Sequence, residues 1–138
     1  MSVLRLLCLA LLTASLYAQS PVAELKAEHD PVKRAEKAVA FAEAAFDNAR
    51  ALYDKGEIDK GDAQLEDMMN ALNECVASLN AAHKAKFYKK PEMKVAYLQR
   101  RMSGLLDDLG IQVRGWAEYT QRKLDEVHDK LLEGAMRK

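Results

Sequence analysis

Three histidines and two cysteines are the first side chains of this sequence to consider as metal ligands or nucleophiles, and their neighbours indicate what chemistry they could carry out. Asp125 and His128 lie three residues apart, a spacing that places a carboxylate and an imidazole on one face of a helix. A di-iron site in a helical bundle needs two such pairs and two further inward carboxylates, and this sequence has one pair. We therefore predict a solvated charged face, with metal binding through His29, His83 or His128 as the alternative.

Cys75 is the one thiol that remains if the segment 1–18, which includes Cys8, is removed. It lies between Leu72 and Leu79 on an apolar stripe, so the sequence predicts a buried cysteine that packs as a small hydrophobic residue. The alternative is a free thiol that reacts or forms an intermolecular disulfide. His83 lies eight residues further on, too far along one helix to activate the thiol. We predict neither a catalytic residue nor a cofactor, and we expect a protein that is not an enzyme.

Charge is unevenly distributed along a chain whose 21 basic and 21 acidic residues cancel. Residues 54–74 hold seven acids and two lysines, whereas residues 83–101 hold seven basic residues and one acid. Aromatic residues are interleaved with the basic ones, and such a pattern can form a docking surface for a polyanion, an anionic lipid head group or an acidic partner. The candidate docking patch consists of Lys84, Lys86, Phe87, Tyr88, Lys89, Lys90, Lys94, Tyr97, Arg100 and Arg101. We favour the other interpretation, a solvated lysine-rich linker whose charge is partly balanced by the acidic turn of the first hairpin, and keep the docking patch as the alternative.

The N-terminal segment, residues 1–18, has the pattern of a secretory signal peptide. Arg5 precedes an apolar run at residues 6–16, and Ala18 supplies a small residue for cleavage. This run is shorter than the roughly 20 residues that a membrane helix needs, so we expect no transmembrane span after cleavage. A retained membrane anchor is the alternative. We expect the remaining chain to be periplasmic or secreted, and export makes nucleic acid an unexpected partner.

Start and stop signals divide the rest of the chain into helices. Asp30 before Pro31 predicts a helix start, because aspartate caps free N–H groups and proline fits the first helical position. Apolar and small residues then alternate at spacings of three and four until Gly56, which ends the helix. A second helix is predicted to be capped by Asp59 and closed by Pro91. These two helices would form an antiparallel hairpin.

The apolar stripe after residue 91 has two interpretations. Gly104, Gly110 and Gly115 each disfavour a helix interior, so we favour a break near residues 109–114 and a second hairpin. The alternative is a three-helix layout with one long helix over residues 91–136. The predicted fold is therefore an all-α antiparallel bundle of about four helices. Its predicted parts are the signal peptide at 1–18, a short helix or linker at 19–30 and one helical domain at 31–136.

Residues 49–65 resemble the centre of a tetratricopeptide-type helical repeat. Leu52, Gly56, Gly61 and Leu65 match the large–glycine–small–large spacing around the turn of that motif. Met68 then stands where the repeat has a small residue, and no second copy follows at the period of about 34 residues that such arrays have. The resemblance implies a helical hairpin that packs on its neighbours and a tendency to bind peptides, without catalytic residues. The whole layout, with its ending at residues 125–134, is similar to small exported bacterial helical proteins of unassigned function.

Function is predicted at the level of class only. We expect a non-enzymatic exported helical protein that mediates protein–protein interaction, either with an unknown partner or with a second copy of itself. One alternative is a protein that binds an anionic envelope surface or another polyanion, or acts as a chaperone, through the basic segment at residues 84–101. The other alternative is the metal-binding protein described above.

Overall fold

The computed structural model describes residues 21–137, and every regular element in that range is helical, which confirms the all-α prediction. The elements are α2 (Pro21–Lys26), α3 (Pro31–Asp54), α4 (Ile58–Ala82), the 3-10 turn η1 (Ala85–Phe87), α5 (Lys89–Asp108) and α6 (Gly115–Met136). Four of the five α-helices are long and packed together, while α2 is short. The proposed signal peptide at 1–18 lies outside the described residues, so it stays a prediction.

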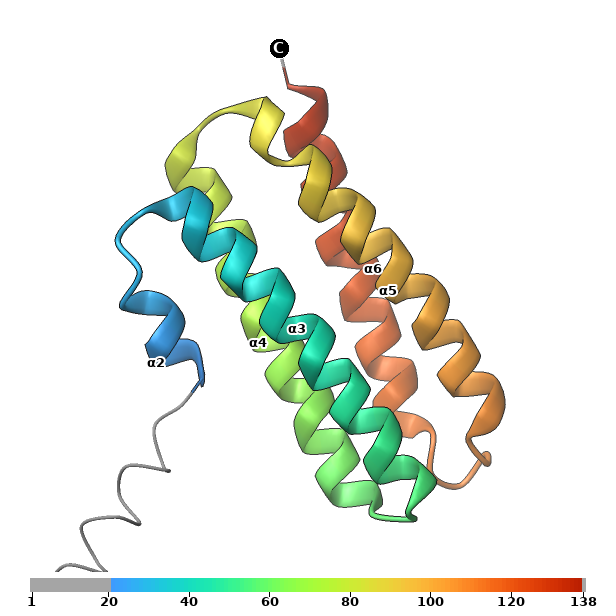
Figure 1. Cartoon of the computed structure of the whole chain (residues 1–138). Helices are drawn as coiled ribbons and strands as arrows, with labels where there is room; N and C mark the ends of the chain where they lie inside the picture. The colour runs from blue at the N-terminus through green and yellow to red at the C-terminus, as the bar shows by residue number, and fades with distance from the viewer. Residues whose placement is uncertain (1–20, 138) are drawn as a thin grey trace, which may run out of the picture.

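The long helices pack as two antiparallel hairpins placed side by side (Figure 1). Helix α3 packs along α4, and α5 packs along α6. The two hairpins join mainly through α4 and α6, whereas α3 and α5 make far fewer contacts with each other. The short α2 packs on α4 and α3. The edge between α3 and α5 is therefore the least closed side of the bundle.

The first helix and its turn follow the predicted signals. The Asp30 side chain accepts hydrogen bonds from the N–H groups of Val32 and Lys33, at 2.9 and 3.5 Å, so it caps α3 as predicted. Helix α3 ends at Asp54, and Gly56 then takes a left-handed conformation with φ of 77°. This turn brings α4 back along α3, as the sequence predicts.

Both ends of the second helix differ from the prediction. Helix α4 begins at Ile58, so Asp59 lies in its first turn and does not cap it. It ends at Ala82 because His83 adopts a left-handed conformation with φ of 57°, which stops the helix well before Pro91. Pro91 is instead a residue of the first turn of α5, where its missing N–H has no intrahelical partner to lose.

Residues 109–114 separate α5 from α6, as the three glycines favoured. Helix α5 ends at Asp108, Leu109 is extended, and α6 begins at Gly115. The alternative of one helix over residues 91–136 is therefore wrong. An uninterrupted helix of about 46 residues would be roughly 69 Å long and would extend far past α3 and α4.

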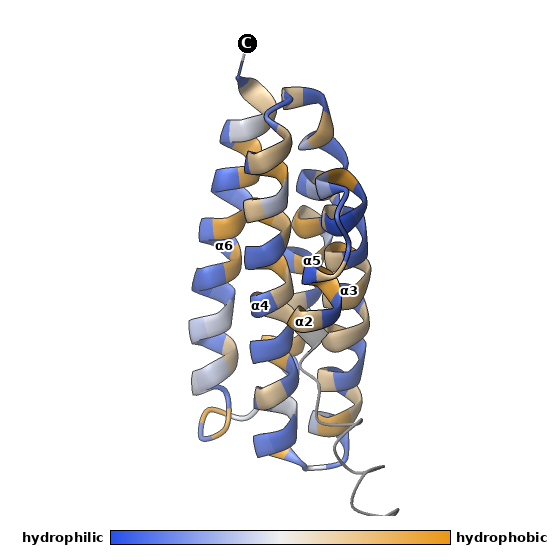
Figure 2. Cartoon of the chain, turned by 90° about the vertical axis from the view of Figure 1, so that its left-hand side faces the viewer, coloured by the Kyte–Doolittle hydropathy of each residue, from blue (hydrophilic) through white to orange (hydrophobic). Residues whose placement is uncertain are grey.

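The core lies between the four long helices and contains large apolar side chains, among them Phe46, Leu72, Leu98, Leu124 and Leu131. Alanines are prominent among the buried residues of α3, and small side chains allow two helices to approach closely. Figure 2 shows hydrophobic residues concentrated between the helices and hydrophilic residues on the outside. Among residues 21–137, no helix combines the length and apolar character that crossing a membrane requires.

Candidate functional site

The structure divides the ten residues of the candidate docking patch into two groups. Six of them line one groove: Lys86, Phe87, Lys89, Lys90, Lys94 and Tyr97. The other four do not line it. Lys84 is exposed in the linker between α4 and η1, and Arg100 is exposed with its guanidinium 5.6 Å from the Tyr97 ring. Tyr88 and Arg101 have structural contacts that are described next.

Tyr88 is a buried anchor and is not available for docking. Only 3% of it is exposed, and its hydroxyl donates a 2.6 Å hydrogen bond to Oδ1 of Asn80 on α4. Its ring lies directly over Gly134 of α6, where a Cβ atom would come within 2.4 Å of the ring carbons. Including Tyr88 in the patch was wrong because its ring finds space at a glycine near the far end of the chain. The contact fixes the corner between η1 and α5.

Arg101 belongs to a series of ion pairs that connects α3 to α5 in the halves of these helices furthest from η1. Its guanidinium pairs with Asp47 and lies 4.5 Å over the Phe46 ring, so it contacts α3 on two sides. Arg50 pairs with Asp108 at 2.6 Å, closer to the end of α5. These ion pairs are largely exposed, so each contributes roughly 0–1 kcal/mol to the stability of the fold. They connect two helices that share little apolar surface.

On the η1 side of these ion pairs, a groove lies between α3 and α5 and extends to η1. Two adjoining hollows form it, with volumes of about 260 and 580 Å³, and both are lined by Lys86, Lys90 and Lys94. The deeper hollow has a mostly apolar lining, contributed by Val32, Ala35, Val39, Leu79, Phe87 and Pro91. The outer hollow is lined by Glu43, Lys86, Lys89, Lys90, Met93, Lys94 and Tyr97. The groove therefore combines an apolar floor with charged walls.

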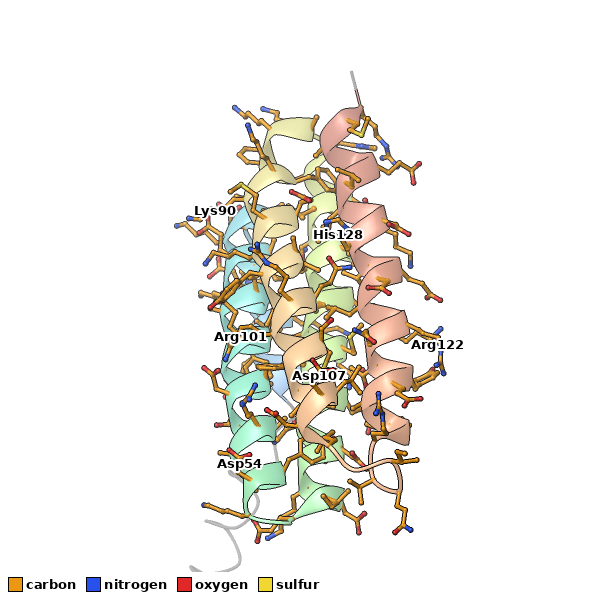
Figure 3. The ribbon with its side chains drawn as sticks, turned by 90° about the vertical axis from the view of Figure 1, so that its right-hand side faces the viewer. Asp54, Lys90, Arg101, Asp107, Arg122 and His128 are labelled. Atoms are coloured by element: carbon orange, nitrogen blue, oxygen red, sulfur yellow. The ribbon has the colours of Figure 1, made fainter. Side chains whose placement is uncertain are left out.

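The α5 wall of the groove is positive. Lys86, Lys89 and Lys90 are exposed and form no ion pair with any residue that the structure describes. Figure 3 shows Lys90 near the η1 end of α5 and Arg101 further along the same helix. On the α3 wall, Glu43 is paired with Lys94 at 3.4 Å, which leaves Glu36 as the one unpaired acid among the described residues that line the groove. Unpaired ammonium groups outnumber unpaired carboxylates, so the groove favours an anionic ligand.

Cys75 is completely buried, as predicted from its place on the apolar stripe. Burial raises the pKa of its thiol to about 12. At neutral pH the thiol is therefore protonated, and the protonated form is neither a good nucleophile nor a metal ligand.

The three histidines lie in different places. His29 and His83 are exposed, and Nε2 of His128 lies 2.7 Å from Oε1 of Glu92 on α5. Asp125, which the sequence pairs with His128, instead accepts a 2.8 Å hydrogen bond from Gln99. Within residues 21–137, no three histidine, cysteine or acidic side chains come together in a way that could hold a metal ion.

Sequence reasoning found the lysines of the groove but not its floor. Val32, Ala35 and Val39 were assigned to the buried stripe of the first helix, and Ala35 and Val39 are indeed almost inaccessible. Their role in the groove depends on how far α5 stands from α3, which no local pattern specifies. The small side chains along this stripe were the available signal, because they allow a neighbouring helix to approach closely.

Comparisons with family models, curated proteins and solved structures found no match to this chain.

Proposed function

We propose that this chain is an exported, non-enzymatic interaction protein that binds an acidic segment of a protein partner in the groove between α3, η1 and α5. The observation that carries the proposal is the row of unpaired lysines beside an apolar floor. Exposed lysines are often unpaired, so it is their position around one groove that favours a binding role. Lys86 and Lys90 line both hollows of the groove.

The two parts of the groove have different roles in binding. Covering one leucine-sized side chain of the partner on the apolar floor contributes roughly 1.5–3 kcal/mol. Ala35, Val39 and Leu79 are almost fully covered already, so the floor contributes mainly through Val32 and Phe87. The lysines stand at the exposed wall, where charges mainly raise the association rate and exclude partners of the wrong sign. A partner that contacts both the apolar floor and the lysines must be acidic and partly apolar.

Other features support binding in preference to a reaction. The Cys75 thiol is buried and protonated, and the described histidines lie apart from the groove residues. The weak resemblance to a peptide-binding helical repeat agrees with this interpretation, although it covers the opposite end of the α3–α4 hairpin.

A photo-crosslinking experiment in cells that produce the protein tests the proposal. A photoreactive residue is placed at Met93, which is 61% exposed and lines the groove, and in a separate variant at Ala63, which is exposed on α4. We expect a discrete protein adduct from position 93 and not from position 63, with the crosslinked partner peptide rich in acidic residues.

Charge reversal supplies the matched control. Lys86→Glu with Lys90→Glu should remove the adduct, while Lys55→Glu with Lys130→Glu changes the total charge equally at exposed sites outside the groove and should preserve it. Equal adducts from both crosslinker positions, or loss of the adduct in both reversal variants, would contradict docking at the groove. Adducts with lipid alone would replace the protein partner by an anionic envelope surface.

A further inference from the structure

The shape of the groove restricts the conformation of its occupant, and this inference rests on the proposed function. We infer that the occupant is an amphipathic α-helix of about three turns, which lies antiparallel to α3 and α5 with acidic residues in its C-terminal half. The argument has three steps, which concern the backbone, the length and the direction of the bound segment.

The backbone of both walls is already hydrogen-bonded within its own helix. Along α3 and α5 the N–H and C=O groups are paired internally, so neither wall offers the free edge that an extended peptide would need. An extended segment would lose hydrogen bonds to water on the apolar floor without replacing them, at a cost of roughly 1–3 kcal/mol for each buried group. A helix satisfies its own backbone, which makes it the favoured occupant.

The length of the groove sets the number of turns. On α3 the lining residues extend from Val32 to Glu43, eleven positions further on, which corresponds to about 17 Å along the helix. Val32, Ala35 and Val39 follow one another at spacings of three and four, so they form a ridge of small side chains on one face. A helix of about three turns matches this length, and its apolar face would contact Val32 and Phe87, because Ala35 and Val39 are almost fully covered within the bundle.

The direction follows from the electrostatics at the η1 end. Both α3 and α5 begin at this end (Figure 1), so the positive ends of two helix dipoles lie near Lys86 and Lys90, which line the deeper hollow together with Val32 of the first turn of α3. A bound helix is most stable with its negative C-terminal end at this position, which makes it antiparallel to both walls. Acidic side chains in its last turns would then reach the lysines of η1 and α5.

The α3 wall adds a restriction on which side of the bound helix is acidic. Glu36 lines the groove near the η1 end and has no ion-pair partner among the described residues. An acid facing α3 would be repelled by Glu36, whereas an acid facing α5 meets Lys86 or Lys90. The expected occupant therefore has one acidic side, one apolar face, and a neutral or basic side toward α3.

Two synthetic peptides of about twelve residues test the inference. They share one composition, with leucines at spacings of three and four, and carry their glutamates in the C-terminal half or in the N-terminal half. Fluorescence anisotropy against the full chain should show at least tenfold tighter binding of the peptide with C-terminal glutamates. Acids near its C-terminus weaken the helix of this peptide in isolation, so helix propensity alone would give the opposite order.

Disulfide trapping then reports the direction of the bound peptide. In separate variants Glu36→Cys marks the η1 end and Glu43→Cys marks the far end, each in a Cys75→Ala background. A peptide with a C-terminal cysteine should be trapped by Glu36→Cys and not by Glu43→Cys. Lys86→Glu with Lys90→Glu should weaken peptide binding at least tenfold, while Lys55→Glu with Lys130→Glu should leave it unchanged.

The possible failures are distinguishable. Trapping at Glu43→Cys, or tighter binding of the peptide with N-terminal glutamates, overturns the direction and leaves the proposed function in place. If neither peptide binds but the photo-crosslinked protein adduct at position 93 is found, the helical occupant is wrong and the proposed function stands. If neither peptide binds and no adduct forms, the inference about the helical occupant and the proposed function are both overturned. Displacement of bound peptide by vesicles of anionic phospholipid at lower concentration than by free peptide would favour a membrane surface and overturn the inference.

Discussion

Replacing Gly134 by alanine should destabilise this protein, although the same change stabilises most helix interiors. Gly134 lies within α6, where alanine is favoured over glycine by roughly 0.5–1 kcal/mol. However, the new Cβ would lie 2.4 Å from Cδ1 and Cε1 of Tyr88, and ordinary contact begins at 3.4 Å. The ring, or the helix beneath it, must therefore move by about 1 Å.

That movement is costly because Tyr88 has little freedom. Its ring is almost fully buried, and its hydroxyl is held by the 2.6 Å hydrogen bond to Asn80. Overpacking of a filled site costs about 1–3 kcal/mol, and weakening the hydrogen bond adds about 1 kcal/mol. After subtraction of the helix-propensity gain, Gly134→Ala should lower the free energy of unfolding by about 1–3.5 kcal/mol.

Gly104 provides a matched control on α5. Its added Cβ would meet no atom within 4 Å, so Gly104→Ala should raise the free energy of unfolding by about 0.5–1 kcal/mol. Urea unfolding followed by circular dichroism measures both variants under the same conditions. In a Tyr88→Leu background, Gly134→Ala should become nearly neutral or stabilising. A Gly134→Ala protein as stable as the parent, alongside a stabilised Gly104→Ala protein, would refute the close contact between Tyr88 and Gly134.

Three further predictions concern the remaining stabilising features. Asp30→Ala removes the side-chain cap of α3 and should lower the free energy of unfolding by about 1 kcal/mol in urea titrations, whereas Asp30→Ser should preserve most of it. The Cys75 thiol, whose pKa burial raises to about 12, should resist a thiol-specific reagent at pH 8 in the native protein and react on unfolding; rapid native-state labelling would contradict its burial. The pKa of Glu28 is lowered from 4.5, chiefly by the hydrogen bond from Lys37, so its ionised form stabilises the fold above that ordinary pKa and the contribution disappears as the pH falls through the lowered value. Lys37→Met should return the Glu28 pKa toward its ordinary value in an NMR titration, and an unchanged pKa would show that Lys37 is not the cause.

Local signals were sufficient where an element begins or ends through its own residues. Asp30 and Pro31 start α3 by capping and by a fitting backbone angle, and Gly56 ends its turn through a left-handed conformation. The break at residues 109–114 contains Gly110, whereas Gly104 is tolerated inside α5 and Gly115 is the first residue of α6. The end of α4 was missed because His83 adopts the left-handed conformation that glycine usually supplies, and few non-glycine residues do so even though histidine is enriched among them.

Tertiary contacts explain the residues of the candidate site that sequence reasoning misplaced. The charge of residues 83–101 predicted a basic surface, and the lysines are on one wall of a groove. Nothing near Tyr88 in the chain indicates burial, because the space for its ring is provided by Gly134 on another helix. In the same way Arg101 on α5 pairs with Asp47, which lies two helices earlier on α3. Partners at such separations depend on helix packing and cannot be read from spacing.

The distance along the chain between Tyr88 and Gly134 also bears on the order of folding. Helices α3 and α4 are adjacent in sequence and pack on each other extensively, so this hairpin can assemble while later residues are still being synthesised. The ring of Tyr88 cannot reach its final position until residue 134 has been made and α6 has docked. The α5 wall of the groove is therefore positioned after the α3 wall. A chain interrupted before residue 134 would contain the α3 wall but would lack the correct placement of the lysines beside it.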